Sequence, residues 1–238
     1  MKYNSPQVIC YNTTNLSSIY LPIGLGILLA LLLAFISPVI HPAFASDIPS
    51  GEDISSSAPL PTLRDFVMTV KTSEPRSLVG VYVPGLLALA IVQQPGDAPG
   101  YVSTQPGVAT QFRMAKDYGT DALLAHNYLS GNLFFELEAG QRVVLIYGDG
   151  RVRFYEIKER NSYQALSPTS PYSNFIDLDN PGTVLSAADV FLKNFGIGSQ
   201  LVFQTCIESA GVESWGRLFV KAEPIRRRIA LGKWASRL

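Results

Sequence analysis

The residues of this chain that are suited to covalent chemistry are one cysteine, one histidine and one arginine. Cys206 is the only cysteine after residue 10 and ends the apolar run Leu201–Cys206. His126 is the only histidine after residue 41 and follows the apolar run ALLA, while Arg217 opens a later apolar run. A thiol, an imidazole and a guanidinium are the groups of a thiolate enzyme, in which a base assists the cysteine and a cation stabilises the developing oxyanion.

Each of these residues also has a structural alternative. A lone cysteine can be a small buried hydrophobe, a histidine can bond to backbone in a core, and an arginine can sit on the surface. Placement favours chemistry, because Cys206 and His126 each stand at the predicted end of a strand, where a polar side chain reaches a rim. Arg217 opens a strand expected to run antiparallel to that of Cys206 after the loop Ile207–Ser214, which brings it to the same rim.

Composition excludes several other classes of site. The chain has 238 residues and a formal net charge of zero, so no overall field draws it to nucleic acid. Two cysteines without a CxxC pair, and one histidine in the body, argue against zinc and iron–sulfur sites. The body has no glycine-rich phosphate loop followed by lysine. We therefore expect no metal, no cofactor and no nucleic-acid partner.

The N-terminal part predicts a membrane segment. Residues 19–40 are almost wholly apolar and uncharged, and about 20 such residues span a bilayer. We expect 19–45 to be a transmembrane anchor or a signal peptide, the latter cleaved after Ala45, where an Ala-Phe-Ala site stands. Residues 1–18 would be a short cytoplasmic segment, and the body would lie outside the cell membrane, or be secreted if cleavage occurs. Residues 46–61, rich in Ser and Pro, predict a linker.

The body, residues 62–224, predicts one mainly β domain. A helix is expected from Thr62, with apolar positions at helical spacing up to Val70, and a second from Ser186 to Gly196. Short apolar or β-branched runs predict about eight strands of a barrel, and Ser162–Gly182 reads as a long loop. The expected strands are Leu78–Val83, Leu86–Gln93, Val108–Met114, Thr120–Ala125, Arg142–Tyr147, Arg151–Glu159, Leu201–Cys206 and Arg217–Ala222. Residues 225–238 form a basic tail, read as a frayed terminus or as a segment for an anionic surface.

Between Leu78 and Pro224 the chain resembles the sortases, the cysteine transpeptidases of Gram-positive-type cell envelopes. The resemblance rests on ALLAH ending in His126, the block GNLFFELEAGQRVVLIYGDGRVRFYEI, the strand LVFQTC ending in Cys206, and WGRLFV with Arg217. The order His, Cys, Arg and the N-terminal membrane segment also match. The sequence departs from the usual family pattern at two places. Ala125 precedes the histidine, where family members usually have Gly, and FQTC stands where the family usually has TLxTC.

The resemblance implies an eight-stranded barrel and a specific reaction. Cys206 would attack a C-terminal sorting motif such as Leu-Pro-x-Thr-Gly on a secreted protein, and Arg217 would stabilise the oxyanion. His126 would protonate the leaving amine and then assist an amine acceptor on an envelope polymer or protein. Thr205, Asn127 and Tyr128 are the expected substrate contacts. Two alternatives stay open: a cysteine peptidase that releases the acyl-enzyme to water, and a non-catalytic secreted β-barrel binding module with an inert Cys206.

Overall fold

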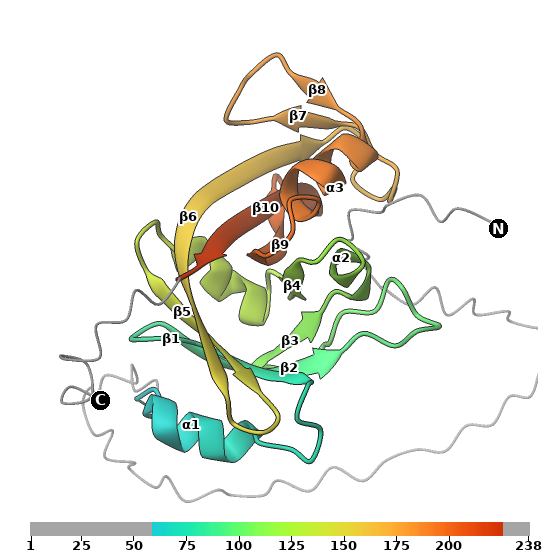
Figure 1. Cartoon of the computed structure of the whole chain (residues 1–238). Helices are drawn as coiled ribbons and strands as arrows, with labels where there is room; N and C mark the ends of the chain where they lie inside the picture. The colour runs from blue at the N-terminus through green and yellow to red at the C-terminus, as the bar shows by residue number, and fades with distance from the viewer. Residues whose placement is uncertain (1–58, 226–238) are drawn as a thin grey trace, which may run out of the picture. The chain divides into compact units, whose positions relative to one another are not determined.

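The computed structural model of the protein describes residues 59–225 (Figure 1). The predicted cytoplasmic segment, the membrane segment or signal peptide, the linker up to residue 58 and the basic tail from residue 226 lie outside the described residues. Between residues 59 and 225, no helix is both long and apolar enough to span a bilayer. The domain boundaries predicted from composition therefore stay predictions.

Strands dominate the described chain, and helices are few and short (Figure 1). The helical elements are α1 (Leu63–Val70), α2 (Arg113–Lys116), the 3-10 helix η1 (Ser130–Glu136) and α3 (Ala187–Phe195). The strands of the first half are β1 (Leu78–Val83), β2 (Leu87–Gln93), β3 (Val108–Gln111), β4 (Asp121–Leu124) and β5 (Arg142–Tyr147). Those of the second half are β6 (Val152–Ala165), β7 (Phe175–Asp177), β8 (Val184–Leu185), β9 (Leu201–Ser209) and β10 (Val212–Pro224).

Eight of these strands close into a barrel, as the sequence predicted. The order is β10-β9-β4-β3-β2-β1-β5-β6, and β10 also pairs with β6, which joins the two edges. β7 and β8 extend the sheet from β6 beyond the barrel. Most neighbours are antiparallel, but β2 pairs with β3, and β4 with β9, in parallel. The parallel pair β4–β9 sets Leu124 beside Gln204, so the residues that follow them in the chain start side by side.

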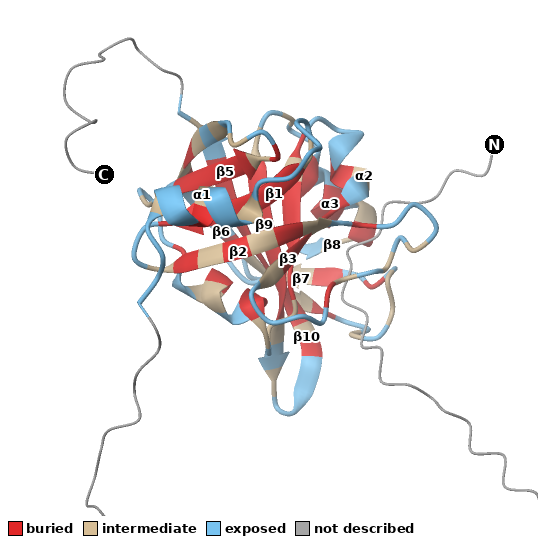
Figure 2. Cartoon of the chain, turned by 90° about the horizontal axis from the view of Figure 1, so that it is seen from below, coloured by how far each residue is buried: buried red, intermediate tan, exposed pale blue. Residues whose placement is uncertain are grey.

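Three apolar clusters hold the barrel, and Figure 2 shows the buried residues concentrated on the strands. One fills the barrel and includes Val81, Leu145, Phe203 and Val220. A second lies on the other face of β9 and β10, where α3 packs, and includes the aromatic residues Phe112, Tyr163, Phe175, Phe191, Phe195 and Phe219. A third places α1 on β1 and β5 through Phe66, Val79 and Ile146. Strand residues of β9 and β10 therefore alternate between the barrel interior and the aromatic cluster.

Both predicted helices begin where the sequence placed their caps. The Thr62 hydroxyl accepts from the Asp65 N–H, and α1 starts at Leu63. Ser186 and Asp189 form a complete capping box at α3, and Gly196 ends that helix. These local signals were readable because the polar cap and the apolar spacing lie within a few residues of each other.

Several predicted strand limits are wrong. The strand expected over Val108–Met114 ends at Gln111, because α2 begins at Arg113. The loop expected over Ser162–Gly182 contains the end of β6 and all of β7. The loop expected over Ile207–Ser214 is mostly strand: β9 runs to Ser209, and only Ala210 and Gly211 turn the chain. Both turn residues have positive φ (50° and 76°), as a two-residue type I′ hairpin requires.

Candidate functional site

Cys206 and Arg217 face each other across the hairpin β9–β10. Their Cα atoms are direct partners in the antiparallel register. Side chains of directly opposed residues lie on the same face with Cβ atoms about 4.5–5.5 Å apart. The expected placement of Arg217 beside Cys206 is therefore confirmed, although neither residue marks a strand end, since β9 continues for three residues after Cys206 and β10 begins five residues before Arg217.

His126 lies at the end of β4, on the other side of β9 from Arg217. Leu124 pairs with Gln204, and the Ala125 N–H donates to the Gln204 carbonyl at 3.3 Å. This parallel register, continued by two residues, sets His126 next to Cys206 on the same face. The three sequence-predicted residues thus form one row across the neighbouring strands β4, β9 and β10.

Arg217 is enclosed by carbonyl oxygens and an aromatic ring. Its side chain is 1% exposed. Nη1 donates to the carbonyls of Ser214 (2.7 Å) and Gly216 (2.9 Å), and Nη2 donates to that of Pro168 (3.4 Å). The guanidinium carbon lies 5.7 Å from the centre of the Phe175 ring. Within residues 59–225 the buried Nε–H has no hydrogen-bond partner, which leaves one N–H donor of a fixed cation unused.

Burial lowers the pKa of Arg217 to about 10, so its guanidinium is still charged at neutral pH. Burial also lowers the pKa of His126 below its ordinary value, while a hydrogen bond to the Val102 backbone and the nearby Glu213 carboxylate act in the opposite direction. A histidine of this kind is neutral at physiological pH and can accept a proton. The imidazole stacks on Tyr128, with ring centres 5.1 Å apart.

A bulge in β10 hydrogen-bonds both to Asn127, which follows His126, and to Arg217. Val212 pairs with Ser209 and Gly216 with Ile207, so three residues of β10, numbers 213–215, oppose a single residue of β9. The Glu213 carbonyl accepts from Asn127 Nδ2 (3.4 Å), and the Ser214 carbonyl accepts from Arg217 Nη1 (2.7 Å). Bulges of this kind re-aim side chains next to functional sites. Sequence reasoning missed it, because a bulge has no reliable signature in a single sequence.

Thr205 and Gly131 hold the end of β4 in place. Thr205 is 1% exposed and donates from Oγ1 to the Ala125 carbonyl at 2.9 Å. The Gly131 N–H donates to the His126 carbonyl at 2.9 Å. A Cβ on Gly131 would collide with Thr205 Oγ1 and lie 2.7 Å from the Ala125 and His126 carbonyl oxygens. Glycine is therefore required at residue 131, a constraint that the sequence reading of the GNLFFEL segment did not detect.

Of the expected substrate contacts, Tyr128 is 58% exposed, whereas Thr205 is buried and Asn127 bonds to the β10 bulge. Cys206 is 8% exposed. Two open clefts of about 510 and 500 Å³ lie on the described part of the chain, but neither is lined by a residue of the row. One is bounded by β6, β10 and the turn after α3, and the other by the β2–β3 loop and α2.

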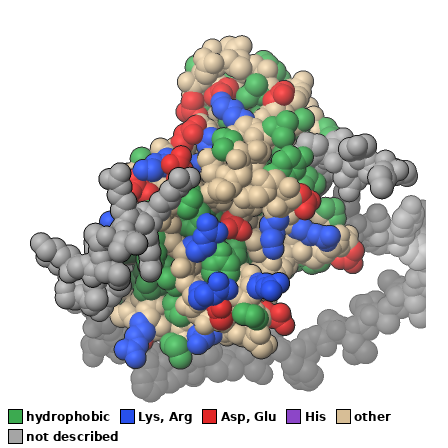
Figure 3. All heavy atoms as spheres, viewed as in Figure 1, with side chains coloured by type: hydrophobic (Ala, Val, Ile, Leu, Met, Phe, Trp, Pro, Cys, Tyr) green, Lys and Arg blue, Asp and Glu red, His purple; other side chains and the backbone are tan. Residues whose placement is uncertain are grey.

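Charge on the face shown in Figure 3 is mixed, with basic and acidic side chains interspersed. Within residues 59–225 no group of three or more His, Cys, Asp or Glu side chains is arranged to hold a metal ion. The chemistry that the row can offer is that of its own thiol, imidazole and guanidinium.

No known family model matches the sequence, and no curated protein matches it. Solved structures similar to the chain include sortase A of Listeria monocytogenes, at 13% identity over 63% of this chain and 88% of that one, with a TM-score of 0.39. Sortase C2 of pilus island 1 of group B Streptococcus is 14% identical over 67% and 78%, with a TM-score of 0.41. Sortase E1 of Streptomyces coelicolor, solved with a tripeptide in its active site, is 15% identical over 65% and 91%, with a TM-score of 0.40.

Proposed function

We propose that this protein is a cysteine transpeptidase in which Cys206 is the nucleophile, His126 the general acid and base, and Arg217 the stabiliser of the oxyanion. The observation that carries the proposal is the pairing of Cys206 with Arg217 across β9 and β10, together with the parallel register of β4 on β9, which continues from Leu124 and Gln204 toward His126 and Cys206. The roles follow from their chemistry, because a thiolate attacks carbonyls, a neutral imidazole moves protons, and a guanidinium donor stabilises negative oxygen.

The reaction runs in two balanced steps. Neutral His126 takes the proton of the Cys206 thiol, and the resulting thiolate adds to the carbonyl carbon of the scissile peptide while Arg217 donates to the oxygen that gains charge. The C–N bond then breaks, His126 gives its proton to the leaving amine, and a thioester remains on Cys206. An incoming amine adds to the thioester and loses a proton to His126, so that an amide forms and the Cys206 thiolate is released. The nucleophile is the thiolate, so the reaction requires Cys206 in its reduced form.

The proposed substrate is a secreted protein with a C-terminal sorting motif such as Leu-Pro-x-Thr-Gly, and the acceptor is an amine on a cell-envelope polymer or protein. Both follow from the sequence resemblance of ALLAH, LVFQTC and WGRLFV to the sortases. The apolar run at 19–40 supports a single-pass membrane protein with its catalytic domain outside the cell. Tyr128, exposed beside His126, and the neighbouring Asn127 are the proposed substrate contacts, whereas the buried Thr205 supports the site by its hydrogen bond to the Ala125 carbonyl.

The proposal is tested with a quenched fluorescent peptide that contains the sorting motif, in the presence of a reductant and a glycine oligomer. We expect turnover by the wild-type chain and loss of at least about 100-fold in Cys206→Ala, His126→Ala and Arg217→Ala. Glu208→Ala, which changes an exposed residue two positions after Cys206 on β9, is the control and should retain activity. Cleavage without capture of the amine would identify a peptidase instead.

The burial of Cys206 favours a second candidate, the binding module with an inert cysteine. A thiol-specific alkylating reagent separates the two. A catalytic Cys206 should be alkylated in the folded, reduced protein faster than in the His126→Ala variant, because the imidazole increases its thiolate fraction. Failure of Cys206 to react before the protein unfolds would contradict the enzyme and favour the binding module.

A further inference from the structure

Ser214, the middle residue of the β10 bulge, is linked to Arg217 both directly and through the Pro168 carbonyl. The Ser214 carbonyl accepts from Arg217 Nη1 at 2.7 Å, and the Ser214 hydroxyl donates to the Pro168 carbonyl at 3.2 Å. The same Pro168 carbonyl accepts from Arg217 Nη2 at 3.4 Å. Ser214 is 8% exposed. The three hydrogen bonds therefore close a buried ring of Arg217, Ser214 and Pro168.

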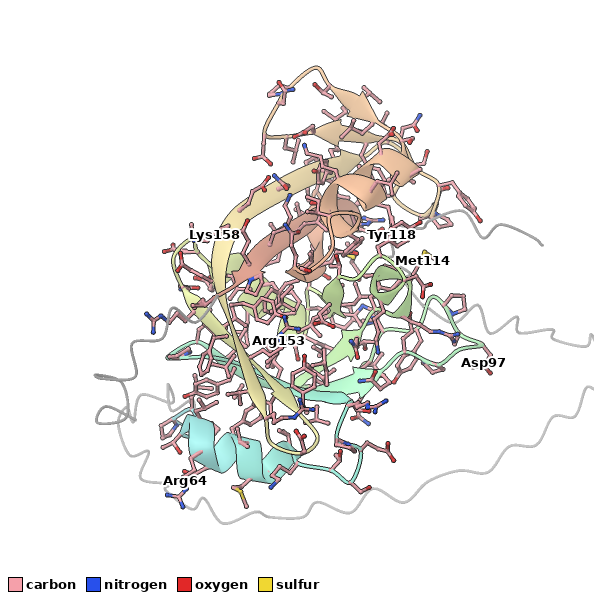
Figure 4. All side chains as sticks on the ribbon, in the orientation of Figure 1. Arg64, Asp97, Met114, Tyr118, Arg153 and Lys158 are labelled. Carbon is pink, nitrogen blue, oxygen red and sulfur yellow. The ribbon has the colours of Figure 1, made fainter. Side chains whose placement is uncertain are left out.

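Pro168 belongs to the loop between β6 and β7, residues 166–174. In Figure 4, β6 can be followed past Lys158 to its far end, where this loop leads into β7. The loop has hydrogen bonds of its own: the Ser167 N–H donates to Ser173 Oγ at 2.9 Å, and Ser173 is 2% exposed. The chain is thus fixed one residue before Pro168 by a bond that does not involve β10, and the hydroxyl of the bulge residue links this loop to β10.

The ring of hydrogen bonds uses the two outer nitrogens of the guanidinium and leaves Nε without an acceptor. Nη1 also donates to the Gly216 carbonyl at 2.9 Å, so both of its hydrogens are engaged. The Nε–H is buried and has no hydrogen-bond partner between residues 59 and 225. A buried donor without a partner costs free energy, and an acceptor that arrives there recovers it. Arg217 and Cys206 are direct partners in the register, so this donor belongs to the side chain opposite the thiol.

We propose that Ser214 is a positioning residue for Arg217, which it holds by its own carbonyl and, through its hydroxyl, by the Pro168 carbonyl. The inference rests on the proposed function for its kinetic consequence, but not for its structural one. The guanidinium is a rigid plane, so acceptors that fix both Nη atoms also fix the direction of the Nε–H. The Nε–H is then the donor that Arg217 offers to the oxyanion formed by attack of Cys206.

The test follows hydrogen exchange of the Arg217 Nε–H in the reduced, full-length chain in detergent. Labelling arginine with ¹⁵N gives the Nε–H signals, and that of Arg217 is identified by its loss in Arg217→Lys. We expect exchange at least about ten-fold faster after Ser214→Ala, because a guanidinium whose loop acceptor is no longer held reaches water more often. Ser214→Thr, which keeps the hydroxyl, should restore slow exchange.

A matched control removes a buried hydroxyl donor from another place in the fold. Thr120 is 1% exposed and donates from Oγ1 to the Phe195 carbonyl at 2.7 Å. Thr120→Val removes a comparable bond without touching the bulge or the β6–β7 loop, so it measures how far a loss of stability alone speeds exchange, and its effect should be smaller. Ser173→Ala removes the acceptor of the Ser167 N–H and loosens the loop from its other side. It should also speed exchange and serves if Ser214→Ala fails to fold.

In the peptide assay, Ser214→Ala should lower kcat about ten-fold with little change in KM, since a donor aimed at the oxyanion acts in the transition state and not in substrate binding. Exchange no faster than in Thr120→Val, in whichever of Ser214→Ala and Ser173→Ala folds, would overturn the inference, and so would faster exchange with an unchanged kcat. The exchange rates also separate the two proposals: faster exchange in a protein whose wild type turns over no peptide supports the hold on Arg217 and contradicts the proposed reaction.

Discussion

Arg217 shows what a single side chain contributes to this site and what it costs. A buried cation normally requires a carboxylate partner, because removal of its charge from water is unfavourable. Within the described residues Arg217 forms no ion pair, and three backbone carbonyls and the Phe175 ring surround it instead. A charge kept in such a place without a counter-ion fits a group reserved for an anion that arrives with the substrate.

Arg217→Lys should therefore lower the free energy of unfolding by about 2 kcal/mol, because a lysine cannot reproduce the forked contacts to the Ser214, Gly216 and Pro168 carbonyls. Peptide turnover should be lost with it, although the charge is conserved. Urea unfolding followed by fluorescence measures the change. Arg160→Lys is the control: Arg160 is exposed and donates to one carbonyl, that of Leu137, so its change should stay within about 0.5 kcal/mol.

At the scale of elements, the site depends on how closely η1 approaches the end of β4. The chain after His126 turns back at once, because the N–H groups of Leu129 and Gly131 both donate to the His126 carbonyl. Thr205 on β9 donates to the preceding carbonyl, that of Ala125. The backbone on both sides of His126 is fixed by these bonds, so the imidazole position follows from element packing and not from the histidine alone.

Gly131→Ala should disturb this packing. The added methyl group would meet two backbone oxygens and the Thr205 hydroxyl at distances that real side chains do not adopt. We expect a loss of about 1–3 kcal/mol in the free energy of unfolding, together with slower peptide turnover. Asn132→Ala, at the exposed neighbouring residue, should change neither quantity appreciably. Equal stability of the two variants would show that η1 can move away from β4 at little cost.

The sequence was informative about elements whose signals are local. The cap residues Thr62 and Ser186 predicted the starts of α1 and α3, and runs of apolar residues predicted most of the strands. The strand limits predicted from the sequence were wrong where pairing with a strand far away in the chain decides how far a strand extends. β9 continues past Cys206 to Ser209 because β10 pairs with it, and β6 extends past Glu159 to Ala165 because β10 and β7 hydrogen-bond to it. Intrinsic strand propensity cannot reveal such pairings, since neighbours supply much of the stability of a strand.

At the scale of the whole molecule, barrel closure brings the row together. His126 and Cys206 are 80 residues apart in sequence, and the parallel pair β4–β9 makes them neighbours. The sequence singled out these three residues by their chemical types and their places in apolar runs, and their catalytic roles stay a prediction. It could not predict the bulge at 213–215, because the bulge depends on contacts that exist only once the barrel has closed.

Burial of His126 in the closed barrel makes the free energy of unfolding depend on pH. Burial is the largest influence on this imidazole and lowers its pKa, so the folded protein binds a proton less readily than the unfolded chain, whose histidines titrate near about 6.5. The unfolded state therefore gains protons first as the pH falls. The free energy of unfolding should be highest above about pH 6.5 and should decrease below it.

His126→Gln isolates this effect, because the difference between the two unfolding curves removes every other titrating group. Asp121 is one such group: burial raises the pKa of its carboxyl, so its contribution to stability has the opposite sign and is lost as the pH rises. We expect the difference in free energy between wild type and His126→Gln to be constant above about pH 7.5 and to shift against the wild type between about pH 6.5 and 5. Urea unfolding of the full-length chain in detergent at several pH values measures it. A difference that is flat over this range would mean that the imidazole is as readily protonated in the folded barrel as in water, and it would contradict the buried, neutral base on which the proposed proton transfers depend.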